Sequence, residues 1–268
     1  MPFLWQLFKP HPVNPTLKNR RQTSYLWSSL LKTPKILIWD LETAGINGFE
    51  ADLASIVCFG YKWLGEKNAH VLTVDQYPNW FSTERGLNDK PLIQVALKIM
   101  DEADIIVAHY GDKFDKPFFA GRCAIHGLTP PAPAKQRDTC FIAWKTFKFS
   151  SNRLQNLADI FRLGEKKYKK ECPDEWPGWW LGALAGNKKA IKEMAKYCAQ
   201  DIQTLEQVYL RLRPYDKAHP RIVDDRATCG TCGGEVEYRG FTYTTDCKYR
   251  RFQCKSCGKW GKESRRVK

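Results

Sequence analysis

Residues 35–43 read KILIWDLET, and this segment decides the fold because it joins an apolar β-type run to two acidic residues. It follows Pro34, and side chains two positions apart on a strand point to the same face, so Asp40 and Glu42 share one face. Acids at the carboxyl end of a buried strand are poorly explained by packing. The alternative is a strand that simply ends in a polar turn. The pair Asp40 and Glu42 is therefore the first candidate site.

The chain around this segment predicts a mixed α/β sheet covered by helices. Two further β-type runs at 55–63 and 69–74 complete a three-stranded meander, and a fourth strand is expected at 105–108. Apolar residues at helical spacing predict helices at 91–103, 115–125, 138–147, 153–163 and 188–212. Residues 165–186, rich in Lys, Pro and Trp, are expected to form a loop. Strands first, followed by alternating strands and helices, favour this architecture.

Two more acidic positions follow elsewhere in the chain. Asp115 opens the helix that follows the strand IIVA, and Pro117 lies in the first turn of that helix. An Asp at this place can be a helix cap, so a structural role is an equal alternative. Tyr197 and Asp201 are four residues apart on the last helix and therefore share a face one turn apart. A hydrogen bond between the two is the structural alternative for this pair.

Taken together, the three segments resemble the DEDD superfamily of 3′→5′ exonucleases, which have an RNase H-like fold. The D-x-E strand, the G-x-x-F-D turn and the Y-x-x-x-D helix occur in the order of that family, and Tyr197 resembles its DEDDy branch, as in polymerase proofreading domains. The resemblance extends to Asp138-Thr139 and to residues 153–158. Tyr110 is a departure, because proofreading domains commonly have Asn at this position.

The resemblance implies a catalytic set of Asp40, Glu42, Asp115, Tyr197 and Asp201. The four acids would hold two Mg²⁺ or Mn²⁺ ions, which neutralise converging carboxylates and suit oxygen ligands. Asp40 would bridge the ions, Glu42 and Asp201 would complete the site of the attacking water, and Asp115 would hold the second ion, directly or through water. Tyr197 would orient the water, since a phenol with a pKa of about 10 is a poor free base.

Several residues are candidates for nucleic-acid contact. Leu41 and Thr43 flank the acids, and Tyr110 stands in the second motif; Phe114 is expected in the core. Four lysines lie near three tryptophans, a mixture that suits stacking on single-stranded bases. Packing of these tryptophans against the domain is the favoured alternative. The residues of this cluster are Lys166, Lys167, Lys169, Lys170, Trp176, Trp179 and Trp180.

Two Cys-x-x-Cys pairs near the C-terminus predict one structural Zn²⁺ ion. The pairs are Cys229/Cys232 and Cys254/Cys257, and the segment between them reads as strand–turn–strand, so a zinc ribbon is expected. A redox dithiol is the alternative. Arg250, Arg251 and Lys259 stand beside aromatic residues in this module and are candidates for nucleic-acid binding. The remaining cysteines show no disulfide pattern.

Positive charge is concentrated at the two ends of the chain. The formal net charge is +14; residues 1–34 hold five Lys or Arg and no acid, and residues 227–268 hold ten against four. Such flanks favour a polyanionic partner, with simple solubility as the alternative. The expected organisation is a basic arm (1–34), an exonuclease domain (35–213), a linker (214–226) and a zinc ribbon with a basic tail (227–268).

The expected function is that of a metal-dependent 3′→5′ exonuclease, with single-stranded or 3′-ended DNA favoured as substrate. It would act in proofreading in trans, repair or recombination, with a DNA polymerase or another replication or repair protein as a potential partner. RNA processing, structure-specific endonuclease action, and an inactive nucleic-acid-binding or assembly protein on the same fold are the alternatives. The longest apolar runs are too short for a membrane span, and the default expectation is a cytoplasmic protein.

Overall fold

The computed structural model describes residues 34–164, 178–223 and 225–267. Two expected features lie outside these residues: the basic arm up to residue 33, and the four lysines of the 165–186 loop together with Trp176. The expected fold class is confirmed, because the described residues form a mixed α/β domain followed by a β-rich segment with a cysteine cluster.

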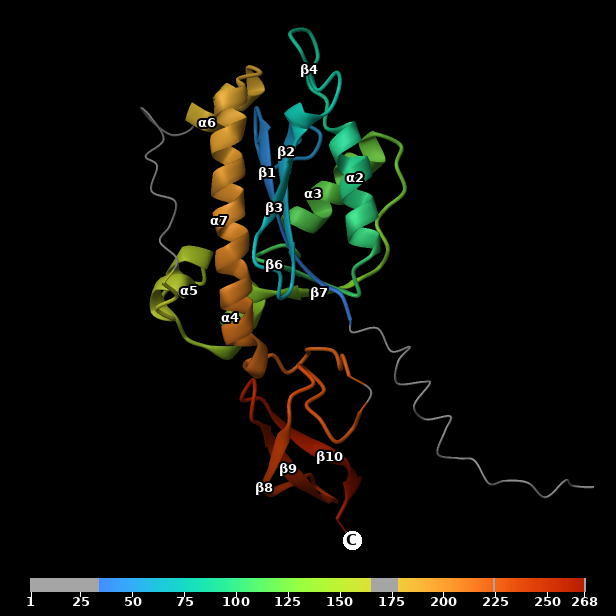
Figure 1. Cartoon of the computed structure of the whole chain (residues 1–268), viewed down its shortest axis with the longest axis vertical. Helices are drawn as coiled ribbons and strands as arrows, with labels where there is room; N and C mark the ends of the chain where they lie inside the picture. The colour runs from blue at the N-terminus through green and yellow to red at the C-terminus, as the bar shows by residue number, and fades with distance from the viewer. Residues whose placement is uncertain (1–33, 165–177, 224, 268) are drawn as a thin grey trace, which may run out of the picture. The chain divides into compact units, whose positions relative to one another are not determined.

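A five-stranded sheet forms the centre of the α/β domain (Figure 1). Its order is β3-β2-β1-β6-β7, and the two pairings among β1, β2 and β3 are antiparallel whereas β6 and β7 extend the sheet in parallel. The bounds are β1 Ile36–Gly45, β2 Ala54–Trp63, β3 His70–Thr73, β6 Ile105–Ala108 and β7 Lys135–Asp138. A two-residue pairing of β4 (Phe81–Ser82) with β5 (Gly86–Leu87) and a 3₁₀ turn, η1 (Val74–Gln76), lie between β3 and the first helix.

Helices cover both faces of this sheet. Figure 1 shows α7 along one face and α2 and α3 on the other. The bounds are α2 Lys90–Asp101, α3 Asp115–Ile125, α4 Thr139–Thr146, α5 Leu154–Ile160, α6 Gly178–Leu184 and α7 Lys188–Leu212, and a 3₁₀ turn, η2 (Arg213–Tyr215), follows α7. Among the described residues, no helix has the length and apolar character needed to cross a bilayer.

The alternation of side chains in β1 explains why the two layers form. Leu37 and Trp39 join the core that contains α2 and α3, and the Trp39 ring meets Phe119 edge-on at 6.1 Å. Ile36 and Ile38 instead pack in a second core with the α7 residues Ile202, Leu205 and Tyr209. The next residues on this α7 side of β1 are Asp40 and Glu42, so the face changes from apolar to acidic along the strand.

Polar contacts hold α7 against the neighbouring strand β2. The ammonium of Lys62 is almost completely buried and contacts Glu206 at 2.5 Å and the Gln203 amide oxygen at 2.7 Å. Glu206 also accepts the backbone N–H of Gly65 at 3.0 Å. A buried charge of this kind requires its partner, so the contact sets the position of the helix that carries Tyr197 and Asp201.

The structure departs from the sequence-based expectation in several segments. Strand β7 was not predicted, and the helix expected at 138–147 begins one residue later because Asp138 ends β7. Within the expected loop, residues 178–184 form α6, and Trp179 is buried in the core. The C-terminal segment has three strands instead of two, in the order β10-β9-β8: β8 Val236–Tyr243, β9 Lys248–Cys254 and β10 Trp260–Arg266.

Candidate functional site

One cavity of about 820 Å³ collects the residues that the sequence singled out in the α/β domain. Its lining includes residues from β1, from the loop after β6, and from α3, α6 and α7. All eight expected residues of this domain are among them: Asp40, Leu41, Glu42, Thr43, Tyr110, Asp115, Tyr197 and Asp201. Positions up to 161 residues apart in the chain therefore share one hollow.

Asp40 and Glu42 lie closest together. Their carboxylate oxygens and the Cys198 thiol are all within 4.8 Å of one another, a group that could hold a metal ion. The strand carrying them is irregular at this point, since its register with β2 shifts between Glu42 and Thr43. A bulge of this kind changes the direction of the side chains that follow it. The Thr43 hydroxyl donates a hydrogen bond to the carbonyl of Gly48 at 2.5 Å.

Asp115 joins this pair from the start of α3 and lines the same cavity. The N-cap of α3 is Phe114, and the Asp115 carboxylate accepts the backbone N–H of Leu41 on β1 at 3.1 Å. The sequence left open whether Asp115 is a helix cap. Its position one residue inside the helix and its bond to β1 favour the other interpretation, in which the side chain belongs to the site.

Burial raises the pKa values of three acids of this site, and neighbouring negative charges add to the effect. Burial raises the pKa of Asp40 well above its usual value, and the charges of Asp115, Glu42 and Asp201 raise it further. The pKa of Glu42 is raised by burial and then by Asp201 and Asp115. Burial raises the pKa of Asp115 to about 7, although the bond from Leu41 opposes this change. Negative charge is thus unfavourable in this site unless a proton or a cation neutralises it.

Tyr197 is held beside these acids as a protonated phenol. Burial raises its pKa, and the charges of Asp201 and Glu42 and a hydrogen bond with Asp201 raise it further. Its ring meets Trp180 edge-on at 6.3 Å. The phenol is therefore a hydrogen-bond donor at neutral pH, which agrees with the expectation that it does not act as a free base.

Cys198 is a neighbour of the site that the sequence analysis did not select. Burial raises its pKa well above the usual value, with further contributions from Asp40 and Glu42. A Cβ atom on Gly60 would lie 2.4 Å from the Cys198 sulfur, so glycine at that position of β2 leaves room for the thiol. A neutral thiol is a weak ligand for hard cations, and packing explains this residue.

Asp138 organises the loop that leads to Asp115. Its carboxylate accepts the backbone N–H groups of Tyr110 and Asp112, both at 3.0 Å, and caps α4 through Cys140 and Phe141. Tyr110 has a φ of 63°, a left-handed conformation that is uncommon for a bulky residue. The resemblance already covered Asp138-Thr139, but nothing in the residues indicated this supporting role. Tyr110 itself is exposed and stacks on Phe141 at 6.0 Å.

Exposed apolar residues form a rim around the cavity that the sequence did not predict. Ile46 is 95% exposed and Phe49 76%, both in the loop after β1, and Leu181 on α6 is 57% exposed. Phe114, expected in the core, packs against the core and also lines the cavity, where its ring meets Phe49 at 5.9 Å. Large apolar side chains exposed around a polar hollow are typical of a binding site.

The donor set of the cavity fits divalent cations. Four carboxylates supply hard oxygen ligands, and the raised pKa values show that positive charge is missing among them. Asp40 and Glu42 would hold such an ion together, and Asp115 and Asp201 line the same cavity close enough to raise the pKa of Asp40.

This electrostatic arrangement predicts how stability depends on pH without added divalent ions. A carboxyl whose pKa is higher in the folded than in the unfolded chain stabilises the fold below the unfolded value and loses that contribution as pH rises through the folded value. For Asp115 this window runs from 3.8 to about 7. We therefore expect the melting temperature to fall as pH rises through this window.

Calorimetry in magnesium-free buffer measures this effect. A domain of this size melts ~2–4 °C lower for each kcal/mol lost, and we expect a fall of at least this size. Mg²⁺ should restore the melting temperature more at pH 7 than at pH 4, and Asp40→Asn should weaken both effects. A melting temperature that rises with pH in both proteins would contradict the predicted repulsion.

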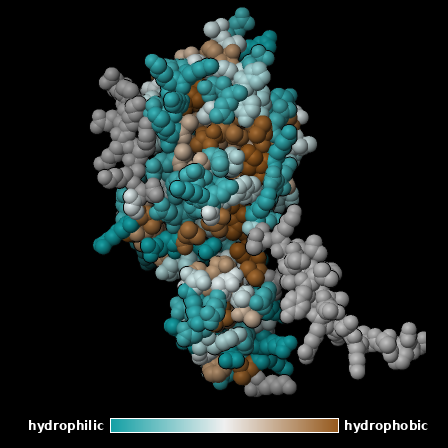
Figure 2. Space-filling model, viewed as in Figure 1, coloured by the Kyte–Doolittle hydropathy of each residue, from teal (hydrophilic) through white to brown (hydrophobic). Residues whose placement is uncertain are grey.

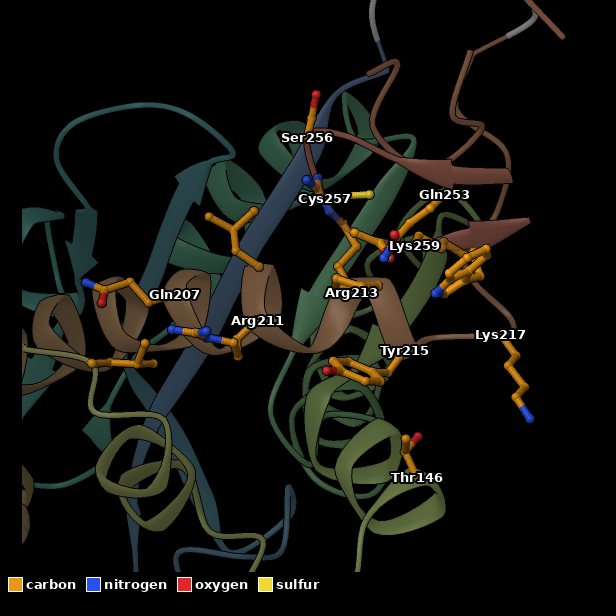
Figure 3. A pocket seen from close by; sticks show the side chains of 15 residues that line it. Thr146, Gln207, Arg211, Arg213, Tyr215, Lys217, Gln253, Ser256, Cys257 and Lys259 are labelled. Atoms are coloured by element: carbon orange, nitrogen blue, oxygen red, sulfur yellow. The ribbon is translucent and has the colours of Figure 1, made fainter. Parts of the chain in front are cut away.

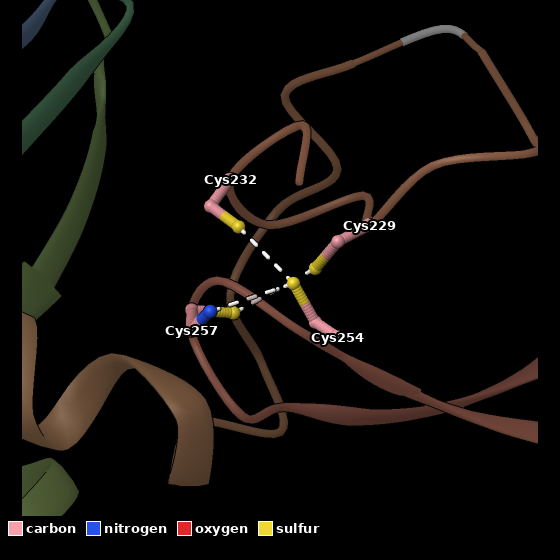
Figure 4. A group of neighbouring side chains, drawn as sticks. All are labelled: Cys229, Cys232, Cys254 and Cys257. Carbon is pink, nitrogen blue, oxygen red and sulfur yellow. Dashed lines mark hydrogen bonds between the residues drawn. The ribbon is translucent and has the colours of Figure 1, made fainter. Parts of the chain in front are cut away.

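The four expected cysteines form a second group that could hold a metal ion (Figure 4). The sulfur atoms of Cys229 and Cys257 are 3.8 Å apart, and those of Cys232 and Cys254 are 3.5 Å apart. Tetrahedral zinc with Zn–S bonds of ~2.3 Å has an S–S edge of ~3.8 Å, so these distances fit. Burial alone would raise the pKa of Cys254, but the N–H groups of Cys257 and Ser256 outweigh it and lower the pKa to about 7.

The two cysteine loops have the same backbone form. Each Cys-x-x-Cys is followed by a glycine at positive φ, 75° at Gly233 and 78° at Gly258. Each glycine donates its N–H to the carbonyl of the first cysteine of its loop, at 2.8 Å and 3.0 Å respectively. Only glycine adopts this conformation without steric cost, so the sequence Cys-x-x-Cys-Gly is matched to the turn.

The three expected nucleic-acid contacts of this segment do not share one surface. Arg250 and Arg251 are adjacent in β9, so they point to opposite faces of the small sheet. Lys259 donates to the backbone carbonyl of Asp216 at 2.9 Å, and burial lowers its pKa. Its ammonium thus connects the cysteine module to residues 214–226.

A search of curated proteins found no match. Among solved structures, the family B DNA polymerase from the hyperthermophilic archaeon Pyrobaculum calidifontis is similar, with a TM-score of 0.48 and 14% identity over 69% of this chain and 26% of the polymerase chain. This chain thus spans about a quarter of the polymerase's length. The model of the RNase H superfamily matches residues 37–213, more than half of the chain, and the chain therefore belongs to that superfamily.

Proposed function

We propose that the chain is a metal-dependent 3′→5′ exonuclease of the DEDDy type that removes nucleotides from single-stranded ends, with DNA as the favoured substrate. The observation that supports this most directly is the convergence of Asp40, Glu42, Asp115 and Asp201 with Tyr197 in one cavity. Three segments with different structural roles would not be expected to bring four acids together by packing alone, since buried like charges repel.

In this proposal the acids are the metal ligands. Divalent ions bound by them would activate a water molecule and stabilise the charge that develops on a phosphodiester. The protein holds the carboxylates in place through the bond from Leu41 to Asp115 and through burial of β1, so little rearrangement is needed when the substrate binds.

Tyr197 would orient the attacking water by hydrogen bonding through its hydroxyl. Its phenol keeps its proton at neutral pH because burial and the nearby acids raise its pKa. The contact with Trp180 and the bond with Asp201 limit the motion of the ring. A residue that orients a reactant in this way affects catalysis mainly through geometry.

The apolar rim would receive the bases next to the scissile bond. Tyr110, Phe49 and Leu181 are exposed and line the same cavity as the acids, and Leu41 and Thr43 line it as well. Exposed aromatic and apolar side chains can stack on unpaired bases but not on bases inside a duplex. This favours a single-stranded end as the substrate.

Strands labelled at one end test this proposal. With Mg²⁺, a strand of about 20 nucleotides with a 5′ label should shorten step by step, and a 3′ label should appear first in a mononucleotide. A circular single strand should remain intact, and omission of Mg²⁺ should stop the reaction. Cleavage of the circle would indicate an endonuclease instead, and faster degradation of RNA of the same sequence would indicate an RNA-processing enzyme.

We further propose that residues 227–268 form a zinc ribbon with a structural ion bound by Cys229, Cys232, Cys254 and Cys257. The matching loops and the sulfur distances support this assignment. No carboxylate joins this group among the described residues, which favours a closed structural site over a catalytic one.

A further inference from the structure

A cleft with basic and aromatic walls separates the end of α7 from the cysteine module. It has a volume of about 1090 Å³ and contains no acidic side chain among the described residues that line it. Figure 3 shows that one wall comes from α7 and the residues after it, and the other from β9 and the turn that follows. Arg211, Lys217 and Tyr215 of the first wall are exposed, and Trp260 of the second is 48% exposed.

The cleft continues onto one face of the three-stranded sheet through Trp260. This residue also lines a second hollow of about 320 Å³ together with Arg251 and Lys262. Strand pairing places Trp260 opposite Gln253, and Lys262 opposite Arg251, so these side chains share a face. We call the surface formed by Arg211, Tyr215, Lys217, Trp260, Arg251 and Lys262 the basic track.

Cations and aromatic rings alternate along this sheet face. Arg251 lies over the Trp260 ring at 5.1 Å, and Lys262 lies over the Tyr249 ring at 3.9 Å. The face has one acid, Glu237, which is paired with Arg239 at 2.8 Å. Figure 2 shows that the surface of this segment visible in that view is mainly hydrophilic.

The opposite face of the sheet is a weaker candidate. It carries Arg250, Tyr238 and Lys248, also in cation–π contact, but it does not include Trp260 and so is not continuous with the cleft. It also contains Glu263, whose carboxylate bonds the Tyr238 hydroxyl.

Basic side chains near a helix C-terminus interact favourably with the helix dipole. This effect explains Arg211 and Arg213 at the end of α7, but not Lys217, which lies beyond the helix end.

We propose that the basic track binds the body of a single-stranded nucleic acid, separately from the acidic cavity that would receive its end. Phosphates would pair with Arg211, Lys217 and Lys262, and bases would stack on Tyr215 and Trp260. The inference rests on nucleic acid as the substrate class of the proposed function, although binding to the track does not require catalysis.

The spacing along α7 determines which strands can use both sites. Asp201 and the last helical turn at Arg213 are 12 residues apart on one continuous run, which corresponds to about 18 Å at ~1.5 Å per residue. At a rise of ~3.4 Å per nucleotide in a stacked strand, about five nucleotides cover this distance. A strand of about three nucleotides with its end in the acidic cavity would therefore not reach the track.

Charge reversal at two exposed positions tests the track. The full chain with Arg211→Glu and Lys217→Glu is compared with a control that carries Lys90→Glu and Lys98→Glu, two exposed lysines of α2 on the other side of the sheet. Binding of labelled oligo-dT of about 20 nucleotides is measured by anisotropy in an Asp40→Ala background, without a chelator so that bound zinc is retained. Oligo-U of the same length distinguishes RNA from DNA.

The charge reversal should weaken oligonucleotide binding about tenfold. It should also lower the salt dependence of the binding constant by the equivalent of about two phosphate contacts. The control substitutions should have a smaller effect on both quantities. Activity is measured in protein that retains Asp40. There, the charge reversal should lower about tenfold the ratio of kcat/KM for the oligo-dT strand to kcat/KM for a trinucleotide. Equal weakening in the control, unchanged binding, or tighter binding of poly-glutamate than of either oligonucleotide would overturn the track. If the parent protein has no nuclease activity but binds the oligonucleotide, and the charge reversal weakens this binding, the proposed function is contradicted and the basic track is not.

Discussion

Replacing Asp40 with alanine should lower the rate of strand degradation with Mg²⁺ by at least ~10³-fold, which is a loss of ~4 kcal/mol of transition-state stabilisation. Asp40 is the central acid of the cavity, because Asp115, Glu42 and Asp201 all raise its pKa through their charges. Its removal would therefore reduce the affinity of the whole site for divalent ions, and gel assays on 5′-labelled single strands measure the effect.

Stability separates this effect from misfolding. The Asp40 carboxylate is buried among like charges, so in magnesium-free buffer the alanine variant should melt at the same temperature as the parent protein or higher. Asp52→Ala is a suitable control because this acid is exposed, and its activity should remain within about threefold of the parent. Full activity of pure Asp40→Ala protein would exclude the acidic cavity as the catalytic site.

Tyr197 should respond differently from the acids. Tyr197→Phe removes only the hydroxyl, and the ring can keep its contact with Trp180. A smaller decrease than for Asp40→Ala, carried by kcat with little change in KM, would support an orienting role.

The parts of the site that depend on periodicity could be predicted from the sequence. Alternation along β1 places Asp40 and Glu42 on the same face as Ile36 and Ile38, and this face is the one that α7 covers. The spacing of four between Tyr197 and Asp201 brings their side chains together on α7. Both relations are local and depend only on the repeat of the element.

The parts that depend on tertiary contacts could not be predicted. Strand β7 (KQRD) has no alternating pattern and forms because it pairs in parallel with β6. Helix α6 contains Gly178 and Gly182, which disfavour a helix, and packing of Trp179 in the core outweighs this preference. The exposed rim residues Ile46 and Phe49 show no repeat that would relate them to acids brought together from elsewhere in the chain.

The same reasoning explains why the third strand of the cysteine module was missed. Strand β10 reads WGKESRR, and its polar residues do not alternate with apolar ones in the usual way. The described residues of the small sheet are mainly exposed or only partly buried. In the described part of this module only Cys229, Thr231 and Cys254 are buried. A segment with so small a core requires another source of stability.

Replacing Cys229 with serine should therefore unfold the module and release its zinc. Structural zinc contributes ~10–16 kcal/mol in small peptides at neutral pH, far more than three buried side chains could supply. Cys247→Ser is a matched control, since this cysteine lies in the same module but outside the four-sulfur group. Metal analysis should find about one zinc per chain in the parent protein and the control, and a large deficit in Cys229→Ser.

Hydrogen exchange locates the consequence along the chain. Residues 228–267 should lose their protection in Cys229→Ser, whereas β1 and α7 should retain theirs because the cores around Ile38 and Trp39 contain no residue of the module's strands. Unchanged protection in zinc-free protein would show that the module is held by other contacts, such as the bond from Lys259 to Asp216. The redox alternative would be supported if freshly purified parent protein contained no zinc and had a disulfide between Cys229 and Cys232. Sulfur atoms this close can either share a metal ion or form a bond with each other.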